Sequence, residues 1–390
     1  MIVVNQFIIK SEVETPWGIA RTGCLSTQHG DIQTPVFMPV ATQGTVKSMS
    51  PQEVWDIGYR MILVNAYHLY LRPGPNLVSE SGGLHTFMSW PGAVLSDSGG
   101  FQIFSLNDLA KVTEAGVSFK SHIDGSAQFL TPETVIEIQL ELGSDILMPL
   151  DHCMTSNASH SELLEALERT NRWFERSLKQ HRGRKGQLFG IVQGGLFEDL
   201  RTKSVEFLAA SDLPGFAIGG LGVGESKAQM HAALELVTKQ LPQAKPRYLM
   251  GIGSPEDFVN CVCRGVDMFD CVLPTRVARN GALFTRFGRV DIHQSQYKNH
   301  WDPISNTCLC YTCSNFSLGY IHHLFKSREI LGLRLATIHN LHFIHQLMDD
   351  LRLAIDNGNV EEFAMEFLAA YKPTSEEMRL QAKDRILRDN

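Results

Sequence analysis

The chain lacks any long hydrophobic run. None of its 390 residues lies in a stretch near the roughly 20 consecutive apolar residues that a membrane-spanning helix needs. The first residues, Met1 to Gln6, carry neither a basic segment nor an apolar run of signal-peptide length. Low-complexity tracts, tandem repeats and Pro/Ser-rich linkers are absent too. We therefore expect a soluble, cytoplasmic protein with no membrane partner, large enough for one enlarged domain or two ordinary ones.

An excess of positive charge is also absent. The formal net charge is −7, so the overall electrostatics do not indicate a nucleic-acid-binding protein. One stretch departs from this average, with four arginines and no acidic residue: Arg276, Arg279, Arg286 and Arg289. The stretch is either a solvated loop or a ridge that contacts phosphates, because phosphate neutralisation needs only clustered Arg or Lys.

The chain has little sign of a disulfide framework. It contains eight cysteines but no secretory signal, which argues for reduced thiols. Cys308, Cys310 and Cys313 form a C-x-C-x-x-C cluster whose short gaps let three thiolates surround one tetrahedral ion. We expect one structural zinc ion; an iron–sulfur centre and a loop of reduced cysteines are the alternatives. Spacing does not choose the fourth ligand among four downstream histidines: His322, His323, His339 and His342.

A dinucleotide-binding fingerprint is missing as well. The run from Gly219 to Glu225 is rich in glycine but lacks the G-x-G-x-x-G spacing with a distal acid. We expect instead that its backbone N–H and C=O groups line a pocket.

What the sequence does contain is a repeated event: a strand-length apolar run stops at a polar residue or a glycine pair. The six stops are Asn65, Asp97, Asp151, Gln193, Gly219-Gly220 and Asp270. Helical patterns separate the runs as far as Asp291, which predicts a parallel sheet covered by helices. Because nearly every strand contributes a polar end, we predict a closed (β/α)8 barrel with one shared site, not an open doubly wound sheet.

The two ends of the chain depart from this alternation. Residues 1–45 alternate apolar and polar positions around glycines, which predicts antiparallel strands that cap the barrel. Residues 300–345 hold the cysteine cluster, and helical patterns follow through Tyr371. We predict one domain over residues 1–390, with a zinc-binding subdomain at 300–345 inserted in it and C-terminal helices after it.

Helix boundaries are also readable. A hydroxyl followed by proline predicts helix starts at Ser50, Thr131 and Ser254, with an acid three residues after the first and third. Helical patterns cover residues 162–180, 227–241 and 257–264.

The polar strand ends have both chemical and structural interpretations. Asp97 lies among small residues that let a ligand approach the backbone, and Phe101 nearby can stack on a planar ring; a tight turn with a capping Asp is the alternative. Gln193 suits bidentate recognition of a heterocycle, or is a satisfied core amide. Asp151 either contributes to ligand binding or caps a turn. Met250 is either a flexible apolar wall of the pocket or an ordinary core residue.

Asp270 carries the sharpest functional prediction. Asp270 follows an apolar strand and comes shortly before the arginine-rich stretch, so a candidate nucleophile lies near a candidate phosphate-binding ridge. An Asp–Arg ion pair is the structural alternative. Two carboxylates around one pocket fit retaining glycosyl transfer, in which one attacks the anomeric carbon and the other manages a proton. Their surroundings must separate their pKa values. The neighbouring amide and backbone groups indicate that a flat base is exchanged.

These motifs resemble the tRNA-guanine transglycosylases of the bacterial queuosine type, from about residue 10 to the C-terminal helices. The matching segments are the Asp97 segment, Asp151-His152-Cys153, Val192-Gln193-Gly194-Gly195, the Gly219-Gly220 loop, Phe269 to Arg276 and the cysteine cluster. The resemblance implies a homodimeric (β/α)8 barrel with one structural Zn²⁺ that replaces guanine by 7-aminomethyl-7-deazaguanine. The exchange takes place at the first anticodon position of tRNAs with a GUN anticodon.

The resemblance also implies roles for single residues. Asp270 is the nucleophile and Asp97 the general acid/base, and the arginine stretch holds the anticodon loop. The residues that bind the base are Asp97, Phe101, Asp151, Cys153, Gln193, Gly219, Gly220, Leu221 and Met250. The zinc ligands are Cys308, Cys310, Cys313 and His339.

Two positions depart from the family pattern. Ala66 stands where the family usually has Thr, which affects how Asp97 is held, and Gly222 stands where Ala is more frequent, which widens the pocket. Cys153 and Val223 match relatives that take the small aminomethyl base; direct use of the bulkier queuine is the alternative.

Two other classes of function compete with this one. A carbohydrate glycosidase is disfavoured because aromatic residues are scarce at the strand ends apart from Phe101. A non-catalytic RNA-binding subunit is disfavoured because Asp97 and Asp270 are both present.

Overall fold

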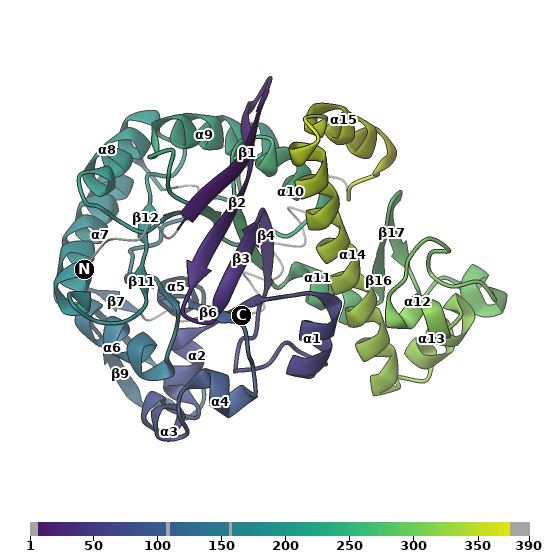
Figure 1. Ribbon diagram of the computed structural model, residues 1–390. Coiled ribbons are helices and arrows are strands. Elements are labelled where there is room, and N and C mark those ends of the chain that lie inside the picture. Colours follow the sequence, from purple (N-terminus) through teal and green to yellow (C-terminus); the bar gives the residue numbers. More distant parts are fainter. Residues whose placement is uncertain (1–6, 107–109, 156–157, 375–390) are drawn as a thin grey trace.

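The computed structural model describes residues 7–106, 110–155 and 158–374. It has a mixed α/β fold in which parallel strands lie at the centre and helices surround them (Figure 1). Within these residues, no helix has the length and apolar character required to cross a bilayer.

The central strands form two parallel sheets, of order β11–β10–β6–β5 and β12–β13–β14–β15–β4. They are β4 (Val36–Pro39), β5 (Met61–Val64), β6 (Ala93–Ser96), β10 (Ile146–Leu147), β11 (Gln187–Leu188), β12 (Gly190–Val192), β13 (Phe216–Ile218), β14 (Arg247–Leu249) and β15 (Met268–Cys271). The two sheets touch at both edges. An isolated parallel bridge pairs Val40 with Leu63, and Phe189 alone separates β11 from β12.

Both faces of the central strands are buried. In β5, Met61 and Leu63 belong to an inner apolar cluster, whereas Ile62 and Val64 belong to the cluster that includes the surrounding helices. The inner cluster takes side chains from β4, β5, β6, β10, β12, β13, β14 and β15. Burial on two faces explains why these strands read as continuous apolar runs in the sequence.

The predicted N-terminal antiparallel sheet is confirmed. It consists of β1 (Phe7–Thr15), β2 (Gly18–Thr27) and β3 (Gly30–Thr34). Phe7, Leu25 and Ile32 reach the inner cluster, and in Figure 1 the sheet lies across one end of the central strands. Residues 1–45 also contain β4, which belongs to the parallel sheet instead.

Three of the surrounding helices match the predicted helical patterns to within two residues at each end. The first five helices are α1 (Pro51–Ile57), α2 (Ala66–Leu71), α3 (Pro75–Glu80), α4 (Leu84–Met88) and α5 (Gly100–Leu106). The others are α6 (Pro132–Leu142), α7 (His160–His181), α8 (Glu198–Ala209), α9 (Lys227–Gln240), α10 (Pro255–Val262) and α11 (Leu273–Arg279). A three-stranded sheet, β7 (Lys111–Val112), β8 (Val117–Lys120) and β9 (Ala127–Leu130), precedes α6.

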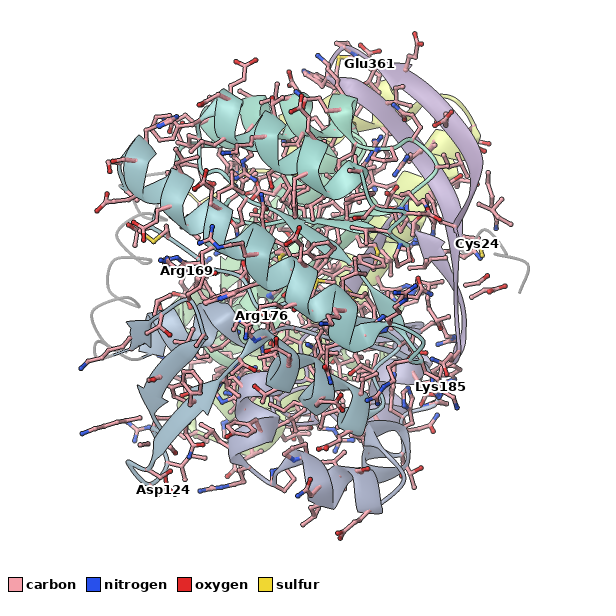
Figure 2. All side chains as sticks on the ribbon, turned by 90° about the vertical axis from the view of Figure 1, so that its left-hand side faces the viewer. Cys24, Asp124, Arg169, Arg176, Lys185 and Glu361 are labelled. Carbon is pink, nitrogen blue, oxygen red and sulfur yellow. The ribbon has the colours of Figure 1, made fainter. Side chains whose placement is uncertain are left out.

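Ion pairs on the outer surface join adjacent helices. Arg176, on the α7 helix that faces the viewer in Figure 2, forms a pair of 2.7 Å with Glu133 on α6. Both side chains are partly exposed, so we expect only a small contribution to stability.

All three predicted helix starts are confirmed, but only two of them have the expected side-chain cap. Ser50 forms a capping box with Glu53, and Thr131 caps α6. Ser254 is the N-cap of α10 with Pro255 after it, but its side chain accepts no capping hydrogen bond. Its hydroxyl donates to Asp257 Oδ2 at 2.6 Å instead, and Lys227 contacts the same oxygen, so this capping box was predicted wrongly.

The C-terminal part packs beside the central strands. It comprises β16 (Ala282–Thr285), β17 (Gly288–Asp291), the 3-10 helix η1 (Ser295–Asn299), α12 (Tyr311–Asn315), α13 (Leu318–Lys326), α14 (Ile330–Asp356) and α15 (Val360–Ala370). In Figure 1, α12, α13, β16 and β17 lie on the side of α14 that faces away from the central strands. The long helix α14 continues through residue 345, the predicted end of the subdomain.

Candidate active site and metal centre

Asp97 follows β6 and is held by the residues that follow the neighbouring strand β5. Asn65 donates a side-chain hydrogen bond to Asp97 Oδ2, and the Ala66 N–H donates to Oδ1 at 2.8 Å. Only 8% of Asp97 is exposed. Burial raises its pKa to about 7, the two hydrogen bonds oppose this shift, and the charge of Asp270 adds to it. A carboxyl with this pKa can both give and take a proton near neutral pH.

The glycines after Asp97 are required by packing. A Cβ on Gly99 would lie 2.8 Å from Cβ of Tyr67, and one on Gly100 would lie 3.0 Å from the carbonyl oxygen of Asp151. The absence of side chains at these two glycines therefore lets the segment after β6 pack closely against α2 and against the segment after β10. Phe101 follows at the start of α5 and is 51% exposed, so its ring is accessible for stacking.

Asp151 and Gln193 form a buried pair. The Gln193 Nε2 donates to Asp151 Oδ2 at 2.7 Å, Cys153 Sγ donates to the same oxygen at 3.2 Å, and Ser98 Oγ donates to Oδ1 at 3.3 Å. Burial raises the pKa of Asp151, and these three donors oppose the shift. The pair is therefore a polar surface of fixed orientation inside an apolar frame.

The glycine pair after β13 lies against the Gln193 amide. A Cβ on Gly219 would lie 2.8 Å from Gln193 Nε2, and one on Gly220 would lie 2.6 Å from Oε1. Gly220 has a φ of +64°, which glycine adopts readily. Leu221 after the pair is buried.

Asp270 lies inside β15, paired with Met38 of β4, and not after the strand as the sequence indicated. Its Oδ1 accepts hydrogen bonds from the Tyr248 hydroxyl at 2.6 Å and from the Gly251 N–H at 2.8 Å. Burial raises the pKa of Asp270, and the two donors oppose this. Within the described residues no arginine forms an ion pair with Asp270. The Asp–Arg ion pair considered as the structural alternative is therefore not formed there. Met250 lies between Tyr248 and Gly251 in the sequence, and it is partly buried.

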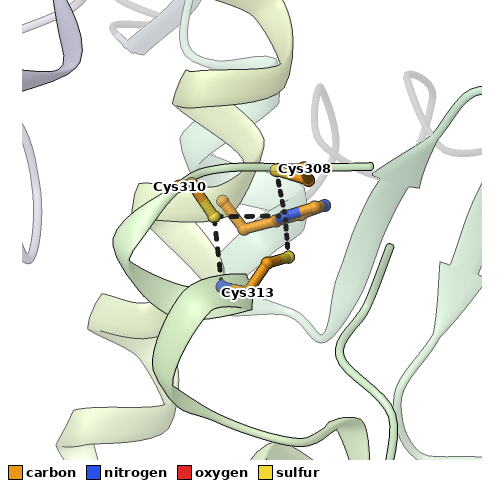
Figure 3. A group of neighbouring side chains, drawn as sticks. Cys308, Cys310 and Cys313 are labelled. Atoms are coloured by element: carbon orange, nitrogen blue, oxygen red, sulfur yellow. Dashed lines mark hydrogen bonds between the residues drawn. The ribbon is translucent and has the colours of Figure 1, made fainter. Parts of the chain in front are cut away.

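The cysteine cluster and one histidine converge beside α14. The thiols of Cys308, Cys310 and Cys313 lie 3.8, 3.7 and 3.4 Å from His339 Nδ1, and the four ligand atoms all lie within 4.8 Å of one another (Figure 3). His339 Nε2 lies 2.7 Å from the Phe284 carbonyl oxygen, so it carries the proton and leaves the Nδ1 lone pair toward the sulfurs. Three thiols and one imidazole fit a tetrahedral metal ion.

The other histidines that spacing left open are placed differently. His342 Nδ1 approaches Cys308 alone among the three thiols, at 3.7 Å. His322 Nδ1 bonds the Ile292 carbonyl oxygen at 2.7 Å. His323 stacks on Tyr320. The geometry therefore singles out His339.

Comparison with known proteins gives the family. A family model described as queuine tRNA-ribosyltransferase matches residues 17–373. The chain belongs to this family. It is therefore an enzyme of the transferase class, as the resemblance of its motifs indicated.

Several relatives carry the same name, queuine tRNA-ribosyltransferase. The protein from Dehalococcoides mccartyi is 51% identical over 369 residues, which covers 95% of this chain and 94% of the relative. The protein from Thermoanaerobacter pseudethanolicus is 52% identical, covering 95% and 98%. The protein from Pelotomaculum thermopropionicum is 54% identical, covering 90% and 95%.

In this family member the four arginines do not form a loop. Arg276 and Arg279 lie on α11, Arg286 at the β16–β17 turn and Arg289 on β17. Arg276 and Arg286 are exposed, whereas the Arg289 guanidinium stacks over Phe284 at 5.4 Å. Burial lowers the pKa of Arg279, and the charge of Arg276 adds to this. The two exposed arginines are thus the ones available to a partner.

Arg201 is a site residue that sequence reasoning missed. It lies on α8, is 1% exposed, and donates to four carbonyl oxygens: Gly195 at 2.8 Å, Gly219 at 2.9 Å, Val192 at 3.2 Å and Gly220 at 3.3 Å. Burial lowers its pKa to about 10. The guanidinium fixes the backbone on both sides of Gln193 and the glycine pair. An arginine inside a helical pattern normally reads as a solvated residue, so no sequence signal distinguished it.

Tyr248 and Glu225 were also missed. Tyr248 is buried beside Asp270, and its hydroxyl is the closer of the two donors. Glu225 is buried and accepts hydrogen bonds from the N–H groups of Gly222 and Val223, which closes the glycine-rich turn. The available signals were positional: Glu225 is the last residue of the glycine-rich run, and Tyr248 lies two residues before Met250.

Proposed function

We propose that the enzyme exchanges a base in tRNA. It replaces guanine at the wobble position of the GUN-anticodon tRNAs for Asp, Asn, His and Tyr with 7-aminomethyl-7-deazaguanine, in queuosine biosynthesis in the cytoplasm. The observation that carries the proposal is the pair of carboxyls in different surroundings: Asp97 with a pKa of about 7, and Asp270 with two donors on one oxygen. Family membership supports the same reaction.

The proposed chemistry is a double displacement with net retention. The Asp270 carboxylate attacks C1′ of the ribose, the bond from C1′ to N9 of guanine breaks, and the leaving base takes the bonding electrons. Asp97 gives its proton to the departing guanine. The incoming base then loses a proton to Asp97 and attacks C1′, which releases the Asp270 carboxylate and restores both carboxyls to their starting states.

The base is recognised by the groups around Gln193. We propose that Asp151, Gln193 and the Gly219–Leu221 backbone bind its polar edge and that Phe101 and Met250 cover its faces. Arg201 supports this assignment because its bonds to the Gly219 and Gly220 carbonyl oxygens fix the direction of that backbone.

The choice between substrates rests on a few positions. Cys153 donates to Asp151 and is small, which favours the aminomethyl base; direct use of queuine is the alternative. Ala66 lacks the hydroxyl that the family usually has there, but its N–H still holds Asp97. A Cβ on Gly222 would lie 2.8 Å from Ile252 Cδ1, so glycine at this position leaves room for Ile252.

We further propose that the central strands close into a (β/α)8 barrel within one domain over residues 1–390. The support is the Val40–Leu63 bridge, the single residue between β11 and β12, and the inner cluster shared by eight strands. The polar residues then lie at the carboxyl ends of the strands, where barrel enzymes have their active sites.

The remaining proposals concern the metal and the partners. Cys308, Cys310, Cys313 and His339 would hold one Zn²⁺, a closed four-ligand site that contributes to folding and not to the reaction, within the subdomain of residues 300–345. Arg276, Arg279, Arg286 and Arg289 would hold the anticodon loop, with the two exposed ones contacting phosphates, in a homodimeric enzyme.

Incorporation of labelled guanine into GUN-anticodon tRNA tests the proposal. Asp270→Ala abolishes incorporation and the covalent protein–RNA adduct seen under denaturing conditions, whereas Asp212→Ala, an exposed aspartate, leaves both intact. Stable exchange by the Asp270→Ala enzyme would overturn the nucleophile assignment. Competition of the aminomethyl base, its cyano precursor and queuine against labelled guanine identifies the incoming base, and a tight preference for queuine selects the alternative.

A further inference from the structure

A second group of metal-ligating side chains lies outside the candidate active site. It consists of His29, His85 and Asp145, whose ligand atoms lie within 4.8 Å of one another. His29 belongs to the β2–β3 turn, His85 to α4, and Asp145 immediately precedes β10. Asp151 follows the opposite end of the same strand, so this group lies at the amino end of β10, away from the proposed chemistry.

Asp145 is held rigidly. It is 2% exposed, its N–H donates to the Val94 carbonyl oxygen at 2.8 Å, and its own carbonyl oxygen accepts from the Gln187 N–H at 2.8 Å. The Val94 N–H donates to Oδ2 at 2.9 Å. The carboxylate is therefore fixed before any ligand arrives, which is the condition for a preorganised metal site.

The two imidazoles approach different oxygens of this carboxylate. His29 Nδ1 lies 2.8 Å from Oδ1, and His85 Nε2 lies 3.3 Å from Oδ2. His85 Nε2 is shielded from solvent, and this 3.3 Å contact with Oδ2 is too poorly aligned to be a good hydrogen bond. A buried nitrogen that is so weakly satisfied costs free energy, which a coordinated metal ion removes.

The two imidazole rings lie against each other. They stack with centroids 3.5 Å apart and planes 13° apart. Lone pairs in parallel ring planes do not converge, so coordination of one ion by both nitrogens turns the rings out of this stack. His29, which is partly exposed, is the ring with room to turn.

We propose that His29, His85 and Asp145 bind a divalent transition-metal ion, Zn²⁺ in the zinc-loaded enzyme. Two imidazoles and one carboxylate without a thiolate suit zinc and its first-row neighbours. His29 has 36% of its side chain exposed, which leaves solvent access for a water ligand. The ion fastens the N-terminal sheet to α4 and to the amino end of β10, so its role is structural.

Metal stoichiometry tests the proposal. The full-length protein is saturated with zinc, transferred to metal-free buffer and analysed by mass spectrometry for bound metal. We expect about two zinc ions per wild-type chain and about one in His85→Phe, which keeps a ring to stack on His29 but removes the nitrogens. His29→Gln, at a surface turn, gives the same loss and covers the case in which the buried variant fails to fold.

A matched control is available on α7. His160 Nε2 also lies 2.7 Å from an aspartate oxygen, that of Asp199, but no third ligand joins them in the described structure. Because the proposed site requires three ligands, we expect His160→Phe to retain the wild-type number of zinc ions per chain.

Cobalt substitution separates the two sites. The thiolate-to-cobalt charge-transfer band reports Cys308, Cys310 and Cys313 and persists in His85→Phe, while one equivalent of cobalt is lost. Equal cobalt and zinc content in wild type and His85→Phe would overturn the proposal and leave His29, His85 and Asp145 as a hydrogen-bonded contact. Loss of the thiolate band together with the second equivalent would also overturn it.

Discussion

The Tyr248 hydroxyl lies 2.6 Å from Oδ1 of Asp270, the carboxyl that we propose attacks the ribose. This hydrogen bond lowers the pKa of Asp270 against the opposing effect of burial. Tyr248→Phe therefore raises that pKa, and the acid limb of the pH–rate profile moves to higher pH. We expect guanine exchange at neutral pH to fall by roughly 10-fold or more, as for the loss of a hydrogen bond to a charged group. An unshifted acid limb would argue against Asp270 as the ionised nucleophile.

Asp97 links the proposed chemistry to stability. Its pKa is about 7 in the folded enzyme and 3.8 in the unfolded reference, so the fold favours the protonated form. This contribution is fully present below about pH 4 and is lost as the pH rises through about 7. Asp97→Asn, which carries no charge, should therefore melt at a higher temperature than wild type at pH 8, with a gain that shrinks at pH 5. The gain is at most about 4 kcal/mol, less the cost of a disturbed Asn65 hydrogen bond. Thermal unfolding at both pH values measures it, and a gain independent of pH would contradict the assignment.

Arg201 is expected to act as a positioning residue for base binding. Lysine keeps the charge but cannot hold four carbonyl oxygens in one plane, so Arg201→Lys loosens the glycine pair. We expect the KM for guanine to rise about 10-fold with a smaller change in kcat, together with a lower melting temperature. Arg172→Lys, at an exposed ion pair with Glu114, is the matched control and should change neither. Equal losses in kcat and kcat/KM would assign Arg201 to the chemical step instead.

The structure separates two histidines at the cysteine cluster. His339→Ala removes the group that faces all three thiols, so we expect loss of about one zinc equivalent and a marked fall in melting temperature. His342→Ala removes a neighbour that approaches Cys308 alone and should retain the metal. Metal analysis of the two variants decides between them, and the reverse result would make His342 the ligand.

Arg276 and Arg286 are expected to contribute to tRNA binding through charge. Replacing either with Ala should raise the KM for tRNA and reduce the slope of log K against log salt by about 0.7. The KM for guanine should stay unchanged. Arg184→Ala, an exposed arginine paired with Glu137 near the end of α7, serves as the control. A salt slope equal to that of wild type would remove these residues from the interface.

The sequence predicted the central strands well because burial on both faces leaves a continuous apolar run. β5, β6 and β13 match the expected runs closely, and the polar residue after each run was the clue to the site. The strand that carries Asp270 extends two residues beyond its expected end at Phe269, because the backbone of Asp270 still pairs with Met38 of β4. A carboxylate inside a strand cannot be told from one after it by composition alone.

The residues that were missed depend on contacts across long separations. Asp145 precedes β10 and looks like an ordinary turn residue, whereas its partner His29 lies 116 positions away. Arg201 sits in an amphipathic helix, where arginine usually faces water, and its carbonyl partners come from two other loops. Such partners are set by the packing of α8 against β12, which no local pattern records.

Packing of Gln193 against the glycine pair restricts how base specificity can change. Atoms of the Gln193 amide lie 2.8 and 2.6 Å from where a Cβ of Gly219 or Gly220 would stand, so any other residue there displaces the amide that we propose binds the base. Laboratory evolution toward a bulkier base should therefore find its tolerated substitutions at Cys153, a half-buried residue, and should leave both glycines untouched. In a saturation library, depletion of every non-glycine codon at these two positions would be the corresponding signature.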